Sequence, residues 1–259
     1  MALSASARPI AGAVATLGVS DRVTFLRKTY AHLGGALIAF ALVTAAMMNY
    51  ATDLSLKLSF AGRNGMGSML LVLLLFVAVS YGAQKLAMSQ TSRGLQYLGL
   101  GIAVVLWSVL VQPMIWWTVI KFGNPADVFV GNEIHAALSP KAAAVLGESA
   151  VITIAIFLGL TLTVFYTKKD FSFLGGILSI GMWAMIGVAI AGIIFGFNLG
   201  MLFSGAIILL MAGYILYQTS LIMNYFPPTM FVAASLMLFT TVVTLFIHVL
   251  RIVGEMNRR

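Results

Sequence analysis

The sequence of 259 residues contains no cysteine. Disulfide bonds, thiolate metal sites and a cysteine nucleophile are therefore excluded. Charge is also scarce: only 8% of the residues are charged, and 7 acidic side chains stand against 15 lysines and arginines. Because 61% of the residues are hydrophobic, the composition is that of an integral membrane protein rather than of a soluble domain.

Two further kinds of site have no support in the composition. The net charge of +8 is spread over loops and tails, without a basic stripe that aromatic residues interrupt, so we expect no nucleic-acid partner. The 3 histidines are scattered and have no carboxylate cluster beside them, so we expect no metal site and no cofactor.

Strict alternation of polar and apolar residues is missing as well, which disfavours a transmembrane β-barrel. Instead, apolar residues form runs of about twenty, the length that carries an α-helix across a bilayer. These runs cover residues 30–49, 67–83, 95–117, 142–166, 173–195, 201–223 and 229–250. The predicted fold is therefore an all-α membrane protein, a bundle of seven transmembrane helices in contact with the lipid bilayer. Ser139 and Pro140 suit the N-cap and the first helical position, which predicts that the fourth helix begins there.

Residues 1–24 are predicted to be a mobile cytosolic tail, and residues 25–259 a single transmembrane domain. A cleaved secretory signal is the alternative, but such a signal needs early positive charge and an unbroken apolar centre. Here the first positive residue is Arg8, Pro9 follows it, and Gly12 and Gly18 interrupt the remaining stretch.

Lysine and arginine in short loops predict the orientation, because such residues stay on the cytosolic side. With seven spans, three groups of them share one side: Arg22, Arg27 and Lys28; Lys85 and Arg93; Lys168 and Lys169. The N-terminus is therefore predicted to be cytosolic. The last run is long enough to cross completely, and a re-entrant last segment is the alternative.

Five short motifs occur in order along the chain: FLRKTYAHLGGAL at residues 25–37, ALSP at 137–140, TKKDFSFLGG at 167–176, ILYQTSLI at 215–222 and LFIHVLRIVG at 245–254. Together they resemble the Bax inhibitor family, with Lys168, Lys169 and Asp170 at the centre of its signature. The resemblance implies seven helices, a core formed by the sixth and seventh helices, and a regulatory or ion-leak role in a membrane.

The resemblance also implies an aspartate in the sixth helix and another in the seventh for members that leak calcium. This chain has Gln218 and Thr241 at those places. Two neighbouring buried carboxylates share a proton and can switch with pH, whereas an amide and a hydroxyl form only neutral hydrogen bonds. The YQTS segment is similar to the bacterial branch that resembles the modulator of the FtsH-type membrane protease. This similarity implies a multi-pass protein of the bacterial inner membrane with that protease as its partner.

Glu148 is the acidic residue that falls within a predicted span. It follows Pro140 by eight residues, which places it about 12 Å into the helix. An ionised carboxylate at the centre of a span costs about 2.5 kcal/mol or more unless it is paired or hydrated. We expect Glu148 either to titrate in a polar cavity that opens to the outside or to be an interfacial acid paired with a cation.

Near the end of the seventh helix, His248 and Arg251 lie one turn apart and are expected to anchor that end at the interface. Ser204, in the sequence FSG, faintly resembles the nucleophile of a serine intramembrane protease, with His248 as a conceivable base. Leu202 stands where that motif needs glycine, and no HExxH motif is present. We expect no enzymatic activity. Gly192, Gly196 and Gly200 are spaced by four and are expected to let helices pack closely.

The function expected from these observations is a membrane regulator that modulates a membrane AAA protease through helix contacts. The alternative is a pH-sensitive leak channel for Ca²⁺ or protons. Its expected pathway residues are Glu148, Gln218, Thr219, Thr240, Thr241 and Thr244, with His248 and Arg251 at the end of the seventh helix.

Overall fold

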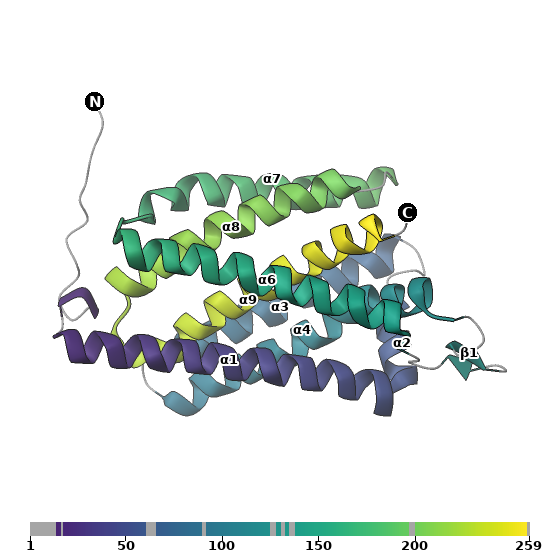
Figure 1. Cartoon of the computed structure of the whole chain (residues 1–259), viewed down its shortest axis with the longest axis horizontal. Coiled ribbons are helices and arrows are strands. Elements are labelled where there is room, and N and C mark those ends of the chain that lie inside the picture. The colour runs from purple at the N-terminus through teal and green to yellow at the C-terminus, as the bar shows by residue number, and fades with distance from the viewer. Residues whose placement is uncertain are drawn as a thin grey trace.

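The computed structural model, which describes residues 14–16, 18–60, 66–89, 92–124, 128–130, 133–134, 138–196 and 200–257, is a bundle of long helices (Figure 1). In this part of the chain, six segments are long and apolar enough to cross a membrane. They contain α1 (Val19–Tyr50), α4 (Arg93–Phe122), α6 (Pro140–Thr167), α7 (Gly175–Phe195), α8 (Met201–Asn224) and α9 (Phe231–Met256). A seventh helix, α3 (Met66–Ala87), is apolar over Leu71–Ala87. These helices confirm the predicted all-α membrane bundle.

The helices extend beyond the predicted apolar runs, because polar residues at the ends of the spans continue the helical turns. Thus α1 begins at Val19 and α9 continues to Met256. Most of the predicted N-terminal tail lies outside the described residues, which include the short 3₁₀-helix η1 (Val14–Thr16). His135 also lies outside them.

Some short elements were not predicted. Helix α2 (Thr52–Phe60) follows α1 directly, and the loop after α4 contains an antiparallel pair of two-residue strands, β1 (Phe129–Val130) and β2 (Glu133–Ile134). The 3₁₀-helices η3 (Ser172–Leu174) and η4 (Pro228–Met230) lead into α7 and α9.

The start of α6 is as predicted. The Ser139 hydroxyl accepts a hydrogen bond from the backbone N–H of Ala142 over 3.1 Å, and Pro140 occupies the first turn. This hydroxyl satisfies one of the backbone donors that lack a partner inside the helix. It also donates to the carbonyl of Phe122 at 2.7 Å, which ties the start of α6 to the end of α4.

The prediction for Gly192, Gly196 and Gly200 was wrong. Helix α7 ends at Phe195, and Gly196 terminates it in the left-handed conformation with φ of 71°. Gly200 is the N-cap of α8. The three glycines therefore do not lie along one helix. A close approach occurs instead at Gly99 of α4, where an added Cβ would lie 2.5 Å from the carbonyl oxygen of Ala83 in α3.

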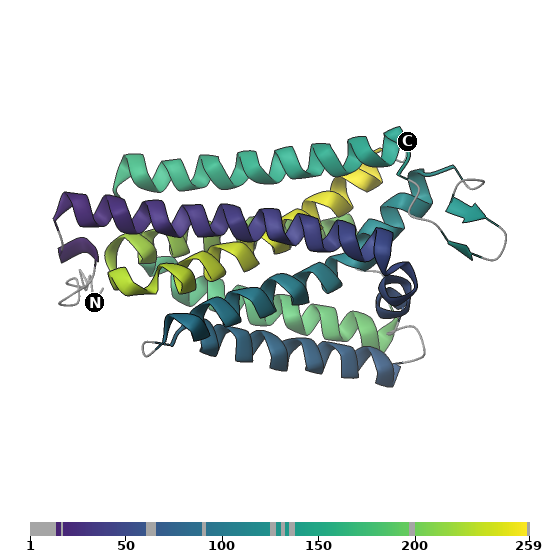
Figure 2. The ribbon, with the colours of Figure 1, turned by 90° about the horizontal axis from the view of Figure 1, so that it is seen from below.

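Helix α9 forms the centre of the bundle. It packs against α1, α3, α4, α6 and α8, and 67% of its apolar span is buried, against 11% of the span that contains α7. Figures 1 and 2 show α9 running the length of the molecule among the other helices. A helix surrounded in this way has to be apolar on nearly all sides. Since α9 is one continuous helix, it favours a complete crossing over a re-entrant segment.

The N-terminal end of the bundle is defined here as the end where α1 and α9 begin and where α6 and α8 finish. The C-terminal end is the opposite one, where α9 finishes near the β1–β2 pair (Figure 1).

Candidate functional site

The turn between α6 and α7 carries Lys168, Lys169 and Asp170 at the N-terminal end of the bundle. Lys168 terminates α6 in the left-handed conformation, with φ of 52°, and its N–H donates to the carbonyl of Val164. This conformation is uncommon for a residue with a side chain and reverses the direction of the chain sharply. All three charged side chains are exposed.

Asp170 connects this turn to the end of α8. Its Oδ1 accepts hydrogen bonds from the Ser220 hydroxyl at 2.8 Å and from the Ser172 N–H at 2.9 Å. Its Oδ2 accepts one from the Tyr225 hydroxyl, also at 2.9 Å. The Ser220 hydroxyl in turn accepts from the N–H of Phe171 at 2.9 Å. Asp170, which the resemblance placed in a family signature, is thus part of a network that fixes the α6–α7 turn on α8.

Two effects act on the ionisation of Asp170. Partial burial acts to raise the pKa of the carboxyl, but the hydrogen bonds from Ser172, Ser220 and Tyr225 outweigh it and hold the pKa below its ordinary value. Asp170 is therefore charged at neutral pH.

Deeper in the membrane, Gln218 of α8 and Thr241 of α9 lie in direct contact. The Thr241 hydroxyl donates to Gln218 Oε1 over 2.9 Å, and both side chains are buried. The structure thus brings together the two residues that occupy the aspartate positions. They form a neutral hydrogen bond, which has no proton to lose near neutral pH.

Polar groups continue around this contact. A cavity of about 120 Å³ between α3, α8 and α9 is lined in part by Gln84, Gln218 and Thr240. Thr244 bonds only to its own helix, since its hydroxyl donates to the carbonyl of Thr240 at 2.8 Å. The hydroxyls of Tyr30, Thr161 and Thr219 are buried together, with those of Thr161 and Thr219 beside that of Tyr30. The N-terminal half of the bundle therefore holds a polar layer.

His248 lies on the opposite half of α9 and faces α8. Its Nδ1 is 3.3 Å from the Ser204 hydroxyl oxygen, so the pair considered from the sequence does come together. The Ser204 side chain is fully buried. Arg251 follows one turn later and is half-buried.

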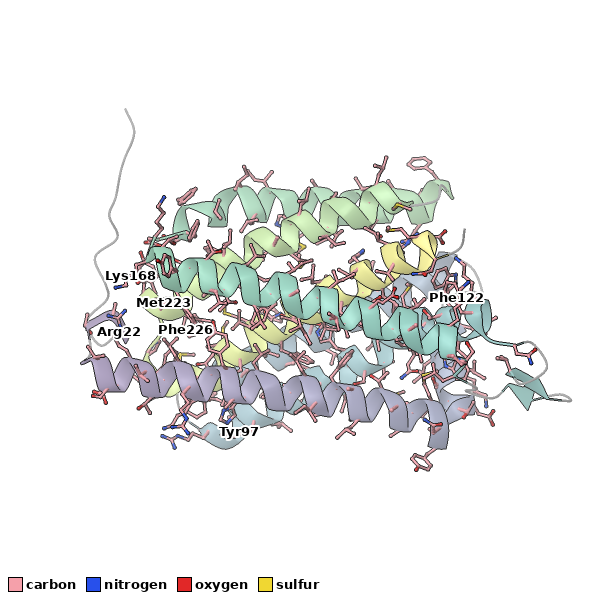
Figure 3. The ribbon with its side chains drawn as sticks, in the orientation of Figure 1. Arg22, Tyr97, Phe122, Lys168, Met223 and Phe226 are labelled. Carbon is pink, nitrogen blue, oxygen red and sulfur yellow. The ribbon has the colours of Figure 1, made fainter. Side chains whose placement is uncertain are left out.

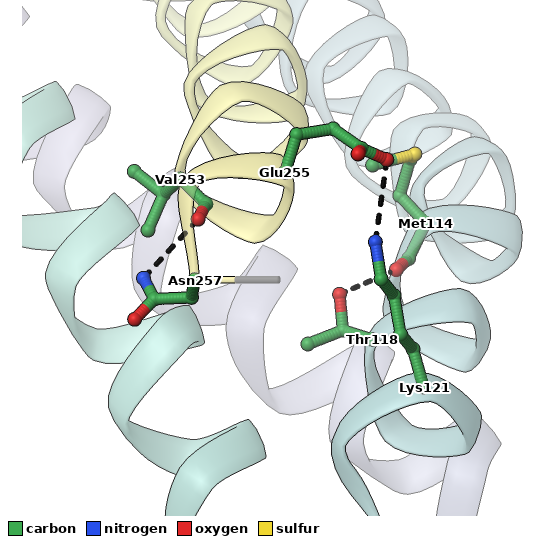
Figure 4. Close-up of polar contacts among 6 residues, drawn as sticks. All are labelled: Met114, Thr118, Lys121, Val253, Glu255 and Asn257. Carbon is green, nitrogen blue, oxygen red and sulfur yellow. Dashed lines mark hydrogen bonds and ion pairs between the residues drawn. The ribbon is translucent and has the colours of Figure 1, made fainter. Parts of the chain in front are cut away.

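Glu148 lies on an exposed face of α6 towards the C-terminal end of the bundle. Its Oε2 accepts a hydrogen bond of 3.3 Å from the amide of Asn257, just after α9. Figure 4 shows the same Asn257 amide bonded to the carbonyl of Val253, beside an ion pair of 3.2 Å between Lys121 and Glu255. This geometry is that of a polar helix end rather than of an internal carboxylate.

One buried polar network was missed in the sequence. The Ser55 hydroxyl of α2 donates to Gln112 Oε1 at 2.8 Å and accepts from the indole N–H of Trp116 at 2.7 Å. Gln112 also donates to the carbonyl of Thr44 over 3.3 Å. This network ties α1, α2 and α4 together at the C-terminal end. A serine in an unpredicted short helix gave no signal that could have identified it.

The expected pathway residues therefore fall into two groups. Gln218, Thr219, Thr240 and Thr241 lie in the N-terminal half of the bundle, and Thr244 lies at the middle of α9. Glu148, His248 and Arg251 lie in the C-terminal half. The family signature, centred on Asp170, lies at the N-terminal end. Among the described residues, no group of three or more histidine, aspartate or glutamate side chains could hold a metal ion.

Comparison with known proteins gives a family over nearly the whole chain. Residues 22–258 match the Bax1-I family, described as inhibitor of apoptosis-promoting Bax1. The chain is 31% identical over 159 residues to Bax inhibitor 1 of Schizosaccharomyces pombe, a match that covers 60% of this chain and 59% of that protein. It is 28% identical over 116 residues to Protein lifeguard 4 of Mus musculus, which covers 43% and 48%.

A bacterial relative aligns over a longer stretch. The chain is 26% identical over 198 residues to an uncharacterized protein of Pseudomonas aeruginosa, a match that covers 74% of this chain and 87% of that protein. In contrast, the matches span less than two thirds of the yeast and mouse relatives.

Proposed function

Since this chain belongs to the Bax inhibitor family, we propose that it is a regulator in the inner membrane of a bacterium, acting through helix contacts rather than catalysis. The relatives in Pseudomonas aeruginosa and Vibrio cholerae support a bacterial setting. The predicted orientation, with the N-terminus in the cytosol, fits the charge of the bundle. Among the described residues, its N-terminal end carries the three basic groups named above but only two acidic residues, Asp21 and Asp170.

The observation that carries this proposal is the isolation of α7. This helix packs against α8 and against η3, and its buried residues are Leu178 and Gly192. Several of its large apolar side chains are exposed, such as Ile180 at 72% and Trp183 at 71%. A helix with so little packing on its own bundle keeps most of its surface available for a helix of another protein.

The proposed partner is a membrane AAA protease complex of the FtsH type. This assignment rests on the resemblance of the YQTS segment, Tyr217 to Ser220, to the bacterial branch with that role. Ser220 is also the residue that holds Asp170, so the same segment supports the turn from which α7 leaves.

Site-specific crosslinking tests the proposal. Because the chain has no cysteine, a single cysteine can be introduced without removing others. Trp183→Cys and Ile180→Cys, in membranes that contain the protease, are expected to crosslink to it. Leu162→Cys on α6 and Leu74→Cys on α3 are matched controls, since both residues are exposed to a similar degree. Equal crosslinking at all four positions, or none at α7, would contradict the proposal.

A leak pathway for Ca²⁺ or protons is the second candidate, favoured by one observation. The cavity beside Gln218 and the buried hydroxyls of Tyr30, Thr161 and Thr219 place polar groups inside the membrane span, where their burial costs free energy. Gln218 and Thr241 close the contact between α8 and α9, so the described structure would correspond to a non-conducting state.

Ion flux in liposomes that contain only this protein separates the two candidates. The regulator proposal predicts no Ca²⁺ or proton flux above that of empty liposomes between about pH 6 and 8, a range in which neither Gln218 nor Thr241 titrates. A flux that Glu148→Gln abolishes would instead establish a leak pathway with a carboxylate gate.

A further inference from the structure

A cavity with a cationic rim opens at the N-terminal end of the bundle. It has a volume of about 240 Å³ and lies between the start of α1 and the ends of α6 and α8. Arg22, Lys168 and Lys169 form its polar side, with Asn224, and Val164, Phe165 and Met223 its apolar side. Figure 3 shows Arg22, Lys168 and Met223 close together at this end of the molecule.

The three cations have no carboxylate partner among the described residues. Asp170 directly follows the lysines, but both of its oxygens bond to α8 and to the η3 turn. Asp21 precedes Arg22, and adjacent residues on a helix do not face each other. Three like charges around one cavity repel each other, and an anion in the cavity would relieve this repulsion.

Several other lysines of the chain have partners that these cations lack. Lys85 lies 4.8 Å from the centre of the Tyr81 ring, and Lys28 lies 5.6 Å from that of Phe231. Lys121 is paired with Glu255. In the described part of the chain, the side chains of Lys168 and Lys169 make no such contact, and neither does that of Arg22.

The lining of the cavity indicates the class of anion. Arginine binds phosphate through a planar pair of donors, and lysine adds a point charge. The apolar half would stay unfilled by a free phosphate ion, whereas a phospholipid places its phosphate beside the cations and its glycerol and first methylenes beside Phe165 and Met223. The position also fits, because basic pockets between transmembrane helices on the cytoplasmic side bind anionic headgroups.

We propose that Arg22, Lys168 and Lys169 bind the phosphate of an anionic phospholipid of the cytoplasmic leaflet. The site would hold one lipid against α1, α6 and α8, beside the network of Asp170. The choice of leaflet rests on the proposed orientation, but the inference does not depend on which partner protein or ion the chain serves.

Native mass spectrometry of the detergent-solubilised protein tests it. The protein is mixed with phosphatidylglycerol, phosphatidylcholine or inorganic phosphate, and the retained adduct is measured. Wild type is expected to retain one phosphatidylglycerol in preference to phosphatidylcholine. Arg22→Gln with Lys168→Asn is expected to weaken this retention by about tenfold or more, since the two charge-assisted contacts together are worth at least about one order of magnitude. Asparagine suits position 168 because it tolerates the left-handed conformation.

Two controls make the result specific. Arg27→Gln with Arg93→Gln removes the same charge from the same end of the bundle but touches no residue of the cavity, so retention is expected to stay unchanged. Met223→Trp narrows the cavity without altering any charge and is expected to weaken retention. Unchanged thermal unfolding of each variant separates loss of binding from loss of the fold.

Three results would overturn the proposal. Equal loss in the control pair would show diffuse attraction rather than a site. Equal retention of phosphatidylcholine would show that the charge of the headgroup is irrelevant. Binding of inorganic phosphate that displaces phosphatidylglycerol would assign the site to a soluble anion.

Discussion

The carboxylate of Asp170 accepts a hydrogen bond from the hydroxyl of Ser220 over 2.8 Å, although 50 residues separate them in the chain. One residue belongs to the turn after α6 and the other to the last turn of α8. The bond thus joins two motifs of the sequence, TKKDFSFLGG and ILYQTSLI, into one structural unit at the N-terminal end of the bundle.

Asp170→Asn is expected to lower the stability of the protein by about 1 kcal/mol, because a charged acceptor is lost from hydrogen bonds that are partly screened by solvent. The folded-state pKa lies below the ordinary value of 3.8, so this stabilisation is complete above about pH 4 and is lost as the pH falls through the folded pKa. Thermal unfolding in detergent against pH checks both points. The difference between wild type and variant should be constant from about pH 5 to 8 and shrink in acid. A difference that grows in acid would contradict the assigned sign.

Thr241→Val is expected to destabilise the bundle by roughly 0.6 kcal/mol, the average for hydrogen bonds between transmembrane helices, and by no more than about 1.7 kcal/mol, the maximum for such bonds. The cost arises because Gln218 Oε1 loses its donor. Adding Gln218→Leu removes the orphaned amide as well, so the double variant should recover part of the loss. A double-mutant cycle of unfolding free energies measures the coupling. Additive effects of the two changes would mean that the bond contributes nothing.

Gly99→Ala is expected to weaken the packing of α3 on α4 by about 1 to 3 kcal/mol, the usual cost of overpacking. The new Cβ would meet backbone atoms of Ala83 and Ala87 at 2.5 and 2.6 Å, and backbone cannot rotate away. Gly101→Ala is the matched control on the same helix, since nothing lies within 4 Å of its added Cβ. Unfolding temperatures of the two variants should therefore differ clearly. Equal temperatures would show that α3 adjusts its position at no cost.

Ser55→Ala is expected to cost about 1 to 3 kcal/mol, because the buried indole N–H of Trp116 and the Oε1 of Gln112 both lose their partner. Ser59→Ala should have little effect, since the Ser59 hydroxyl bonds only to the carbonyl of Ser55 within its own helix. Tryptophan fluorescence during unfolding reports on Trp116 once the other three tryptophans are replaced by phenylalanine. Equal unfolding temperatures of the two alanine variants would show that the Ser55 network does not stabilise the fold.

Features that depend on local chemistry were predictable from the sequence. The apolar runs predicted the transmembrane helices because the thickness of the bilayer sets their length. Ser139 and Pro140 predicted the start of α6, because the first backbone N–H groups of any helix need a hydrogen-bond acceptor from outside the helix.

Features that depend on packing were not predictable in the same way. The depth of Glu148 follows from its spacing after Pro140, but α6 is apolar on most of its surface, so no pattern revealed which face would be buried. The partner of Asp170 lies on another helix, and Ser55 lies in α2, a helix too short to give an apolar run.

The central place of α9 has a consequence for biosynthesis. Helix α9 contacts α1, α3, α4, α6 and α8, yet it is the last of these helices to leave the ribosome. The earlier helices are therefore inserted into the bilayer before their common partner exists. Final assembly is expected to wait until α9 has been synthesised, and a chain truncated before Phe231 would lack the helix that the other helices pack against.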